Sequence, residues 1–598
     1  MPSGHPAPSL GQAGSEEAIA KQRKPLRSRR TKIVGTLGPA SVPKIRELIL
    51  AGVNMFRLNF SHIKDPETQT PIIEEIRRHS KQLGIPVAIL GDLGGPKIRC
   101  NTFQPTETIT LDPSKPVRLR ASDEPGTDGL ITTSIRTVIK QLDPGHRVLL
   151  DDGNLILRVK SRISDEELEL EVLTGGVLKS RKGINVPDVQ LDVPALTDKD
   201  AVDARYMFRQ RLEYIALSFV QKDQDVRDLL EVFEDCKEKE GLEHKTGSNE
   251  DLNEPDALEP GWRPHIILKI ETPHSLENID SLIEISDGIM VARGDLGVEV
   301  SLERVPVIQK MLIRKTNSAN KPVITATQML ESMINSPVPT RAEVSDVANA
   351  VLDGTDAVML SAECATGKYP VETVKMMGSI CKTAEDGEGY MQPKRLGHVY
   401  TVVAGKREFS EPIADAAVAA SEEADAAALI TITVTGEMAS YVSKRRPNRP
   451  ILAITSSYSV WRRLVLLYGV YPILTSSTKS KHITSPTASR SATSPDKFAP
   501  IGRPASPGLG GIVTNTDQIY AQTEVDISAS DVNKALGIQQ GDKVVFCAGY
   551  HMPWPGLSNS VKMARFGDAS RVVKVRGLWG EALEKAGKKG SPIKSELP

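Results

Sequence analysis

Residues 265–295 read HIILKIETPHSLENIDSLIEISDGIMVARGD. Two apolar runs, His265–Ile270 and Gly288–Ala292, stand near the two ends of this stretch, and the gap between them is long enough for a crossover helix. Such short, near-continuous apolar runs are typical of strands that are covered on both faces of a parallel sheet. Acidic residues, Glu271 and Asp295, follow the two runs. The stretch therefore predicts one β-α-β unit with a carboxylate near the end of each strand.

Apolar runs of this kind occur eight times along the chain, counting the two in this stretch. Most of the gaps hold an amphipathic segment of helical length, such as Val42–Ala51 and Asp225–Lys239. Eight strands joined by crossover helices predict a (β/α)8 TIM barrel. The six other predicted strands are Lys32–Leu37, Met55–Phe60, Val87–Leu93, Tyr214–Val220, Pro322–Ala326 and Ala357–Ser361.

One gap, between the third and fourth strands, is about 120 residues long and has a different texture. Apolar and polar residues alternate there, and Asp151–Gly153 and Gly175–Gly176 have the composition of turns. We expect an inserted β-barrel lid domain over the catalytic end of the barrel. Its clearest predicted strands are Val148–Leu150, Leu155–Lys160 and Leu168–Leu173.

A separate α/β domain is expected after the barrel. It would begin with a helix over Ala414–Ala428 and continue with strands at Leu429–Val434, Ile451–Thr455, Val470–Leu474, Lys543–Ala548 and Arg571–Val575. The predicted boundaries are a disordered tail at 1–30, barrel parts at 31–97 and 195–385, the lid at 98–194, and the C-terminal domain at 396–598. Composition predicts disordered loops at 241–261 and 475–511.

Composition excludes several classes of function. The 76 acidic and 75 basic residues nearly cancel, so the overall charge favours neither a nucleic-acid partner nor an anionic membrane surface. No apolar run approaches the roughly 20 residues of a membrane span, and we see no secretory signal. The five cysteines are scattered without a CxxC pair, which is typical of reduced thiols in a cytoplasmic protein.

Polar residues at the strand ends point to chemistry, because active sites of such barrels gather there. Glu271 and Asp295 are hard oxygen ligands that suit Mg²⁺ or Mn²⁺. Lys269, Arg57 and Arg99 would surround the same mouth, and a metal with several cations suits a transferring phosphoryl group. An enolate or a carboxylate would also bind to such a set. Each residue taken alone is more often part of a rim ion pair, but their joint placement favours a site.

Several stretches resemble the motifs of pyruvate kinases. They are Arg57–His62 (RLNFSH), Ile267–Glu271 (ILKIE), Ile289–Glu299 (IMVARGDLGVE), Pro322–Met333 (PVITATQMLESM) and Pro339–Pro370 (PTRAEVSDVANAVLDGTDAVMLSAECATGKYP). The resemblance implies transfer of the phosphoryl group of phosphoenolpyruvate to ADP, giving pyruvate and ATP as the last step of glycolysis. It also implies a homotetramer and a regulatory role for the C-terminal α/β domain.

The resemblance assigns roles position by position. Lys269 would stabilise the transferring phosphoryl group and the developing enolate, and Arg57 would contact the phosphate of phosphoenolpyruvate. Thr327, with Ser361, would belong to the relay that protonates the enolate. The substrate carboxylate would meet the backbone at Ala292, Gly294 and Asp295. The nucleotide would contact His62, Arg99 and Lys182, and the lid acid Asp152 would close over it.

Lys97 is a departure within the family pattern. Family members that need K⁺ bind it with residues matching Asn59, Ser61 and Asp92, and they carry Glu at the position of Lys97. A fixed ammonium can supply the charge that K⁺ otherwise supplies, so we expect Lys97 to serve this monovalent-cation position and the enzyme to work without K⁺. The alternative is that Lys97 pairs with a lid carboxylate and K⁺ still binds.

A second departure lies at Thr433–Ala439 (TVTGEMA), which resembles the loop that cradles a phosphate of fructose 1,6-bisphosphate in activated relatives. Glu437 places a carboxylate there, so we expect weak activation or none. Two other functions stay open: a metal-dependent lyase or phosphomutase barrel acting on 2-oxo-acid enolates, and a non-catalytic metabolite-sensing homologue.

Overall fold

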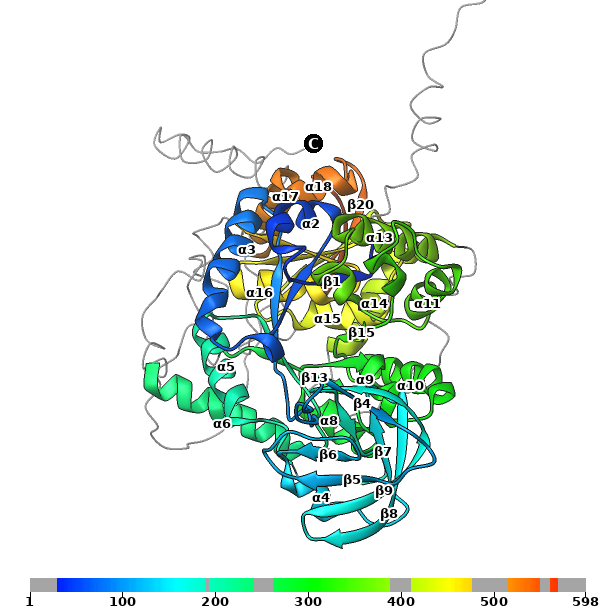
Figure 1. The fold of residues 1–598 in the computed structure, drawn as a ribbon. Helices are drawn as coiled ribbons and strands as arrows, with labels where there is room; N and C mark the ends of the chain where they lie inside the picture. Colours follow the sequence, from blue (N-terminus) through cyan, green and yellow to red (C-terminus); the bar gives the residue numbers. More distant parts are fainter. Residues whose placement is uncertain are drawn as a thin grey trace, which may run out of the picture.

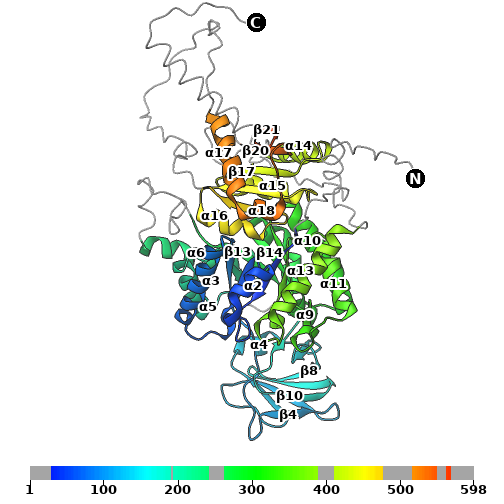
Figure 2. The ribbon, with the colours of Figure 1, turned by 90° about the horizontal axis from the view of Figure 1, so that it is seen from above.

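The computed structural model describes residues 29–189, 193–240, 262–387, 410–475, 515–548 and 560–567. These residues form three tiers (Figure 2): an all-β domain, a barrel in the middle, and an α/β domain on the far side of the barrel. The loop predicted at 241–261, the loop predicted at 475–511 except its first residue, the strand predicted at Arg571–Val575 and most of the predicted tail lie outside the described residues. In the part of the chain that the structure describes, no helix has the length and apolar character needed to cross a membrane.

The central tier is a closed barrel of eight parallel strands in the order β1-β16-β15-β14-β13-β12-β3-β2. The predicted (β/α)8 barrel is confirmed, and every strand lies where the apolar runs predicted it, with the longer runs trimmed at their ends. The strands are β1 Lys32–Thr36, β2 Met55–Asn59, β3 Ala88–Asp92, β12 Tyr214–Leu217, β13 His265–Ile270, β14 Gly288–Ala292, β15 Val323–Ala326 and β16 Ala357–Leu360.

Helices surround these strands and bury their apolar sides against them (Figure 1). Capping boxes start three of the helices, at Thr197 with Asp200, at Thr272 with Ser275 and at Thr340 with Glu343, because each side chain there satisfies a free backbone N–H. The helices are α2 Ile45–Ala51, α3 Thr70–Leu83, α5 Asp198–Arg209, α6 Asp223–Glu240, α7 Pro273–Glu277, α8 Ile279–Ile285, α9 Arg293–Glu299, α10 Val305–Ser318, α11 Arg341–Leu352, α12 Ala362–Ala365 and α13 Pro370–Asp386.

The inserted domain has its own apolar core and leaves the barrel after β3, at the carboxyl end of the strands. Its described strands form a six-stranded sheet in the order β11-β7-β8-β9-β5-β6 and a two-stranded sheet, β10-β4. The elements are β4 Thr108–Leu111, β5 Val117–Ala121, β6 Leu130–Thr133, α4 Arg136–Gln141, β7 Arg147–Leu150, β8 Leu155–Ser164, β9 Glu167–Thr174, β10 Gly176–Lys179 and β11 Ile184–Asn185. We keep the name lid for this domain.

The C-terminal domain is a five-stranded sheet, β19-β18-β17-β20-β21, in which only β21 runs antiparallel to its neighbour. The helix predicted at Ala414–Ala428 was placed too late in the chain: α14 begins at Ser410 and ends at Glu423, Asp425 turns the chain with a φ of 50°, and Ala428 opens β17. The elements are α14 Ser410–Glu423, β17 Ala428–Ile432, α15 Glu437–Lys444, β18 Ile451–Thr455, α16 Tyr458–Arg463, η8 Leu464–Leu466, β19 Val470–Leu474, α17 Asn515–Ala529, α18 Asp531–Leu536, β20 Lys543–Ala548 and β21 Ser560–Arg565.

The C-terminal domain fills the floor of the barrel, which is the end opposite the lid. Val465 and Leu466 of η8 are buried in one apolar cluster with side chains from inside the barrel, including those of Met290 and Ala326. The eight strands therefore do not complete their own interior.

Charged groups join the barrel and the C-terminal domain beside this floor. Asp356, which precedes β16, is fully buried and accepts hydrogen bonds from Lys444 and from Arg446, the latter at 2.8 Å. Burial opposes ionisation, but the two cations outweigh it and hold the pKa of Asp356 below its usual value. Arg30, within the predicted tail, is also buried: its N–H donates to Glu385 and its carbonyl accepts from Gly469 of the C-terminal domain.

Candidate active site

Four charged side chains from three strands form a connected chain at the barrel mouth. Arg57 of β2 donates to Asp92 of β3 at 2.6 Å. The Lys269 ammonium of β13 lies 3.5 Å from the other Asp92 oxygen and 2.8 Å from Glu271. Asp92 and Glu271 are both fully buried or nearly so. The structure thus brings Arg57, Lys269 and Glu271, which the strand ends had singled out, together with Asp92, which the resemblance had placed at the monovalent-cation position.

The electrostatics of this chain follow from its burial. Burial alone would lower the pKa of Lys269, but Asp92 and Glu271 outweigh it, so the pKa is raised and the ammonium stays charged. Burial raises the pKa of Glu271 to about 7; Lys269 opposes this rise and Asp295 adds to it. Glu271 is therefore a buried carboxylate close to a second carboxylate, an arrangement that a bound cation would relieve.

Two residues after β12 hold this chain in place and were missed by the sequence reasoning. The Ser218 hydroxyl accepts from Lys269 at 2.8 Å and donates to the Leu93 carbonyl at 2.7 Å. The Phe219 N–H donates to Glu271 at 2.7 Å, and Phe219 adopts a φ of 55°, which is uncommon for a bulky residue. The sequence reasoning passed over them because it placed Ser218 and Phe219 inside the fourth strand, predicted at Tyr214–Val220, whereas β12 ends at Leu217.

Asp295 lies in the first turn of α9, and its side chain is 31% exposed. The Lys97 ammonium lies 3.5 Å from an Asp295 oxygen. Lys97 therefore pairs with a carboxylate of the barrel, not with a lid carboxylate as the alternative interpretation supposed. Of the other residues at the monovalent-cation position, Asn59 accepts from the N–H of Ser61 at 3.2 Å.

Thr327 follows β15 in a strained conformation. Its φ is 66°, and a β-branched residue pays a steric penalty in this left-handed region. Arg293 holds the conformation by donating to the carbonyls of Thr327 at 2.7 Å and Gln328 at 3.0 Å, while it pairs with Asp346. The Thr327 hydroxyl accepts from the Gly294 N–H at 2.8 Å. Strain of this kind is common at functional sites.

Ser361 follows β16 and is the residue before α12. Its N–H donates to Glu363 at 2.7 Å, which fixes the turn. Its hydroxyl oxygen is buried and has no hydrogen-bond partner among the described residues. A buried hydroxyl of this kind is rare unless water or a ligand completes its bonding.

The predicted nucleotide contacts come from the lid and from the short helix after β2. Lys182 of the lid forms an ion pair with Asp151 at 2.6 Å. Its partner is therefore the residue before Asp152, the predicted lid acid. Arg99 donates to the Arg181 carbonyl at 3.1 Å within the lid. His62, at the end of the short helix after β2, is exposed.

Comparison with known proteins identifies the family. Residues 28–258 and 256–374 match the model of the pyruvate kinase barrel domain, and residues 411–564 match that of the pyruvate kinase alpha/beta domain. The chain belongs to the pyruvate kinase family. Membership makes it a phosphotransferase.

Pyruvate kinases from several organisms are similar to this chain. The enzyme from Geobacillus stearothermophilus is 43% identical over 450 residues, which cover 74% of this chain and 71% of the relative. The enzyme from Clostridium acetobutylicum is 36% identical over 541 residues, covering 89% and 99%. A crystal structure of a pyruvate kinase from Cryptosporidium parvum superimposes with a TM-score of 0.74 at 31% identity, covering 90% of this chain and 96% of that one.

Pyruvate kinases generally use a divalent metal, and this site fits one. The buried Glu271 carboxylate faces Lys269 at 2.8 Å, and Asp295 raises its pKa from nearby, so two carboxylates share this mouth. No group of three or more His, Cys, Asp or Glu side chains suited to a metal occurs in the described parts of the chain. Two protein oxygens, completed by substrate oxygens and water, are what Mg²⁺ commonly takes in phosphoryl-transfer sites.

Proposed function

We propose that this protein transfers the phosphoryl group of phosphoenolpyruvate to ADP, producing pyruvate and ATP. The observation that carries the proposal is the connected chain Arg57–Asp92–Lys269–Glu271, which lies with Asp295 at a barrel mouth beside a lid. Two fixed cations next to two metal-binding carboxylates suit a phosphate whose charge spreads over three oxygens during transfer.

Each group has a chemical part in this reaction. Arg57 would bind the substrate phosphate, since Asp92 orients its guanidinium. Lys269, kept charged by its carboxylate neighbours, would stabilise the phosphoryl group and the enolate oxygen. Glu271 and Asp295 would hold Mg²⁺ or Mn²⁺, which when bound would offset negative charge on the phosphoryl oxygens. The backbone at Ala292, Gly294 and Asp295 would receive the substrate carboxylate.

Protonation of the enolate would use the polar groups after β15 and β16. The Thr327 hydroxyl is fixed by the Gly294 N–H, and the Ser361 hydroxyl has unused bonding capacity. A threonine hydroxyl is a weak acid, so the two would orient a water that delivers the proton. The nucleotide would lie between the lid and barrel, near His62, Arg99, Asp152 and Lys182.

The proposal includes activity without K⁺. The pairing of Lys97 with Asp295 supports it, because a permanent ammonium already stands beside a carboxylate assigned to the divalent metal. Asp92, at the predicted cation position, is balanced by Arg57 and Lys269, which hold its pKa down against the effect of burial.

We also propose weak or absent activation by fructose 1,6-bisphosphate. Glu437 opens α15 at the loop in question, and its carboxylate would repel a phosphate. The loop hydroxyls bond within the loop: Thr433 accepts from Gly436 at 2.9 Å, and Thr435 accepts from Glu437 at 3.4 Å.

A homotetramer is part of the proposal. Exposed apolar side chains on the outside of the barrel support an interface between copies, and size-exclusion chromatography with light scattering would test it. They are Leu302, Val307 and Val338. A cytoplasmic location stays a prediction of the cysteine usage; all five cysteines are buried.

A coupled assay tests the reaction. Phosphoenolpyruvate, ADP and Mg²⁺ are supplied, and lactate dehydrogenase reports pyruvate. We expect turnover in the wild type and in Lys310→Met, an exposed lysine of α10, but none above background in Lys269→Met. Activity in Lys269→Met equal to the wild type would contradict the assignment.

Two measurements separate the other functions: protection from proteolysis by ADP, and turnover in the coupled assay. A lyase or phosphomutase barrel would have no need of a nucleotide, so protection from proteolysis by ADP favours the kinase. A non-catalytic homologue would show no turnover although Lys269, Glu271, Asp295 and Thr327 are all present.

A further inference from the structure

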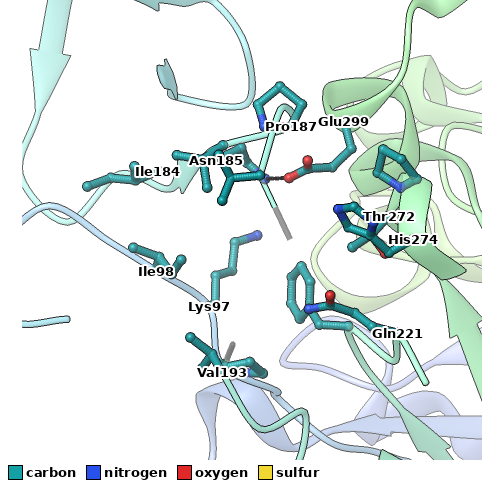
Figure 3. A pocket seen from close by; sticks show the side chains of 15 residues that line it. Lys97, Ile98, Ile184, Asn185, Pro187, Val193, Gln221, Thr272, His274 and Glu299 are labelled. Carbon is teal, nitrogen blue, oxygen red and sulfur yellow. Dashed lines mark hydrogen bonds between the residues drawn. The ribbon is translucent and has the colours of Figure 1, made fainter. Parts of the chain in front are cut away.

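A cleft separates the lid from the barrel beside the candidate active site (Figure 3). Lys97 and Ile98, where the chain enters the lid, form one wall, and Thr272 and His274, after β13, lie across from it. A single hydrogen bond crosses the edge of this cleft between the residues drawn: the Asn185 side chain of the lid donates to the Glu299 carboxylate of the barrel at 2.7 Å.

Asn185 is closely tied to the lid residues that the nucleotide would meet. It lies in β11, which pairs with β7 so that Asn185 is opposite Leu149. Just before it, the Gly183 carbonyl accepts from the Asp151 N–H at 3.2 Å, and Lys182 pairs with Asp151. Because these bonds are all local, fixing Asn185 fixes Lys182 and the acidic turn at the same time.

Glu299 is equally tied to the catalytic groups of the barrel. It ends α9, and Asp295 lies one turn earlier in the same helix. The lid also touches α9 at a second place: a Cβ on Gly153 would lie 3.7 Å from a methyl group of Val298. The last turn of α9 is thus a seat for the lid, and its first turn carries a metal carboxylate.

The surroundings of Glu299 disfavour the ionised form of its carboxyl group. Burial raises its pKa, Asp295 and Asp188 raise it further, and the hydrogen bond from Asn185 is the strongest influence in the opposite direction. A half-buried carboxylate without a hydrogen-bond donor is unfavourable, so the hydrogen bond from Asn185 stabilises Glu299 in this position.

We propose that Glu299 is a positioning residue which, through its hydrogen bond with Asn185, seats the lid on α9 and sets Lys182 and Asp151–Asp152 in register with Asp295. The role builds on the proposed kinase reaction. Its specific consequence is that the contact controls ADP, which the lid binds, and leaves phosphoenolpyruvate, which the barrel binds, largely unaffected.

An exchange of the two side chains tests the proposal. Asn185→Asp puts two carboxylates at hydrogen-bond distance and should raise the KM for ADP by about tenfold, as expected for loss of one charged hydrogen bond. The KM for phosphoenolpyruvate and the Tm should change little. The double variant Asn185→Asp/Glu299→Gln lets the new amide donate to the new carboxylate, so the KM for ADP should return to about the wild-type value.

Glu299→Gln alone is the matched control, because its amide oxygen still accepts from Asn185; a small change in the KM for ADP is expected. An unchanged KM in Asn185→Asp, a double variant as impaired as Asn185→Asp, or an equal loss for both substrates with a lower Tm would each overturn the proposal.

Amide hydrogen exchange over residues 184–188 gives a readout that needs no turnover. Exchange should be faster in Asn185→Asp and restored in the double variant. If the wild type failed to make pyruvate, the proposed reaction would be wrong, and the exchange data would still decide whether Glu299 seats the lid: unchanged exchange would reject the seat.

Discussion

Replacing Lys97 by Glu should convert an enzyme that works without K⁺ into one that needs it. The Lys97 ammonium lies 3.5 Å from Asp295. Coulomb's law gives about 5 kcal/mol for two unit charges at this distance of 3.5 Å with an effective dielectric constant of about 20, and about 1 kcal/mol in water. Because the two side chains are 36% and 31% exposed, we take the lower part of this range, about 1–2 kcal/mol.

A loss of about 1.4 kcal/mol corresponds to tenfold in rate. Lys97→Met should therefore lose about tenfold in kcat/KM for phosphoenolpyruvate when K⁺ is absent. Lys97→Glu should lose more, because it also adds a negative charge beside Asp295, and K⁺ should restore most of its activity.

The assay is the coupled measurement of pyruvate in tetramethylammonium buffer, with and without K⁺. Lys140 is an exposed residue of the lid helix α4, and Lys140→Glu changes the net charge by the same amount. The activity of this control variant should equal that of the wild type both with and without K⁺. A wild type that needs K⁺ at saturating substrates, or a Lys97→Glu variant indifferent to K⁺, would refute the reasoning.

Three further predictions concern the junction of the barrel and the C-terminal domain. Asp356→Ala leaves Lys444 and Arg446 buried without their carboxylate and should lower the free energy of unfolding by about 3–5 kcal/mol. A loss of no more than about 1 kcal/mol in thermal unfolding, which is what an exposed ion pair contributes, would contradict this. Leu466→Ala should cost about 2–5 kcal/mol, and a cost well below that would show that the floor is not a packed core. Burial lowers the pKa of Lys32 to about 7 in the folded state, from 10.5. Between pH 7 and pH 10.5 the folded state therefore binds fewer protons at Lys32 than the unfolded state does. The free energy of unfolding should then rise with pH, by about 1–2 kcal/mol from pH 7 to 8.5. Lys32→Met should remove this rise, and an unchanged difference in Tm between the two pH values would contradict the assignment.

The barrel was predictable because its strands are apolar on both faces and end in polar residues. The runs before Glu271 and before Asp295 needed no tertiary information, since buried parallel strands leave a continuous apolar signal. The end of α14 was misjudged for the opposite reason: Ala414–Ala428 is rich in alanine, and only the turn at Asp425 separates a helix from a strand of similar composition.

Pairings between distant segments could not be predicted. Arg293 holds the backbone of Thr327 across two strands, and a left-handed threonine leaves no mark in sequence. Asp151 and Asp152 are adjacent acids, so pattern alone could not say which one pairs with Lys182. The apolar character of Leu466 shows that it is buried but not that its neighbours are in another domain.

The floor of the barrel has a consequence for how the chain is made. Strand β16 ends at Leu360, but the residues that fill the interior below it begin with η8 at Leu464. During synthesis all eight strands leave the ribosome before their last core residues do, so the nascent barrel stays open at one end and exposes apolar surface. A chain truncated after α13 should therefore aggregate instead of folding, even though it contains every residue of the active site.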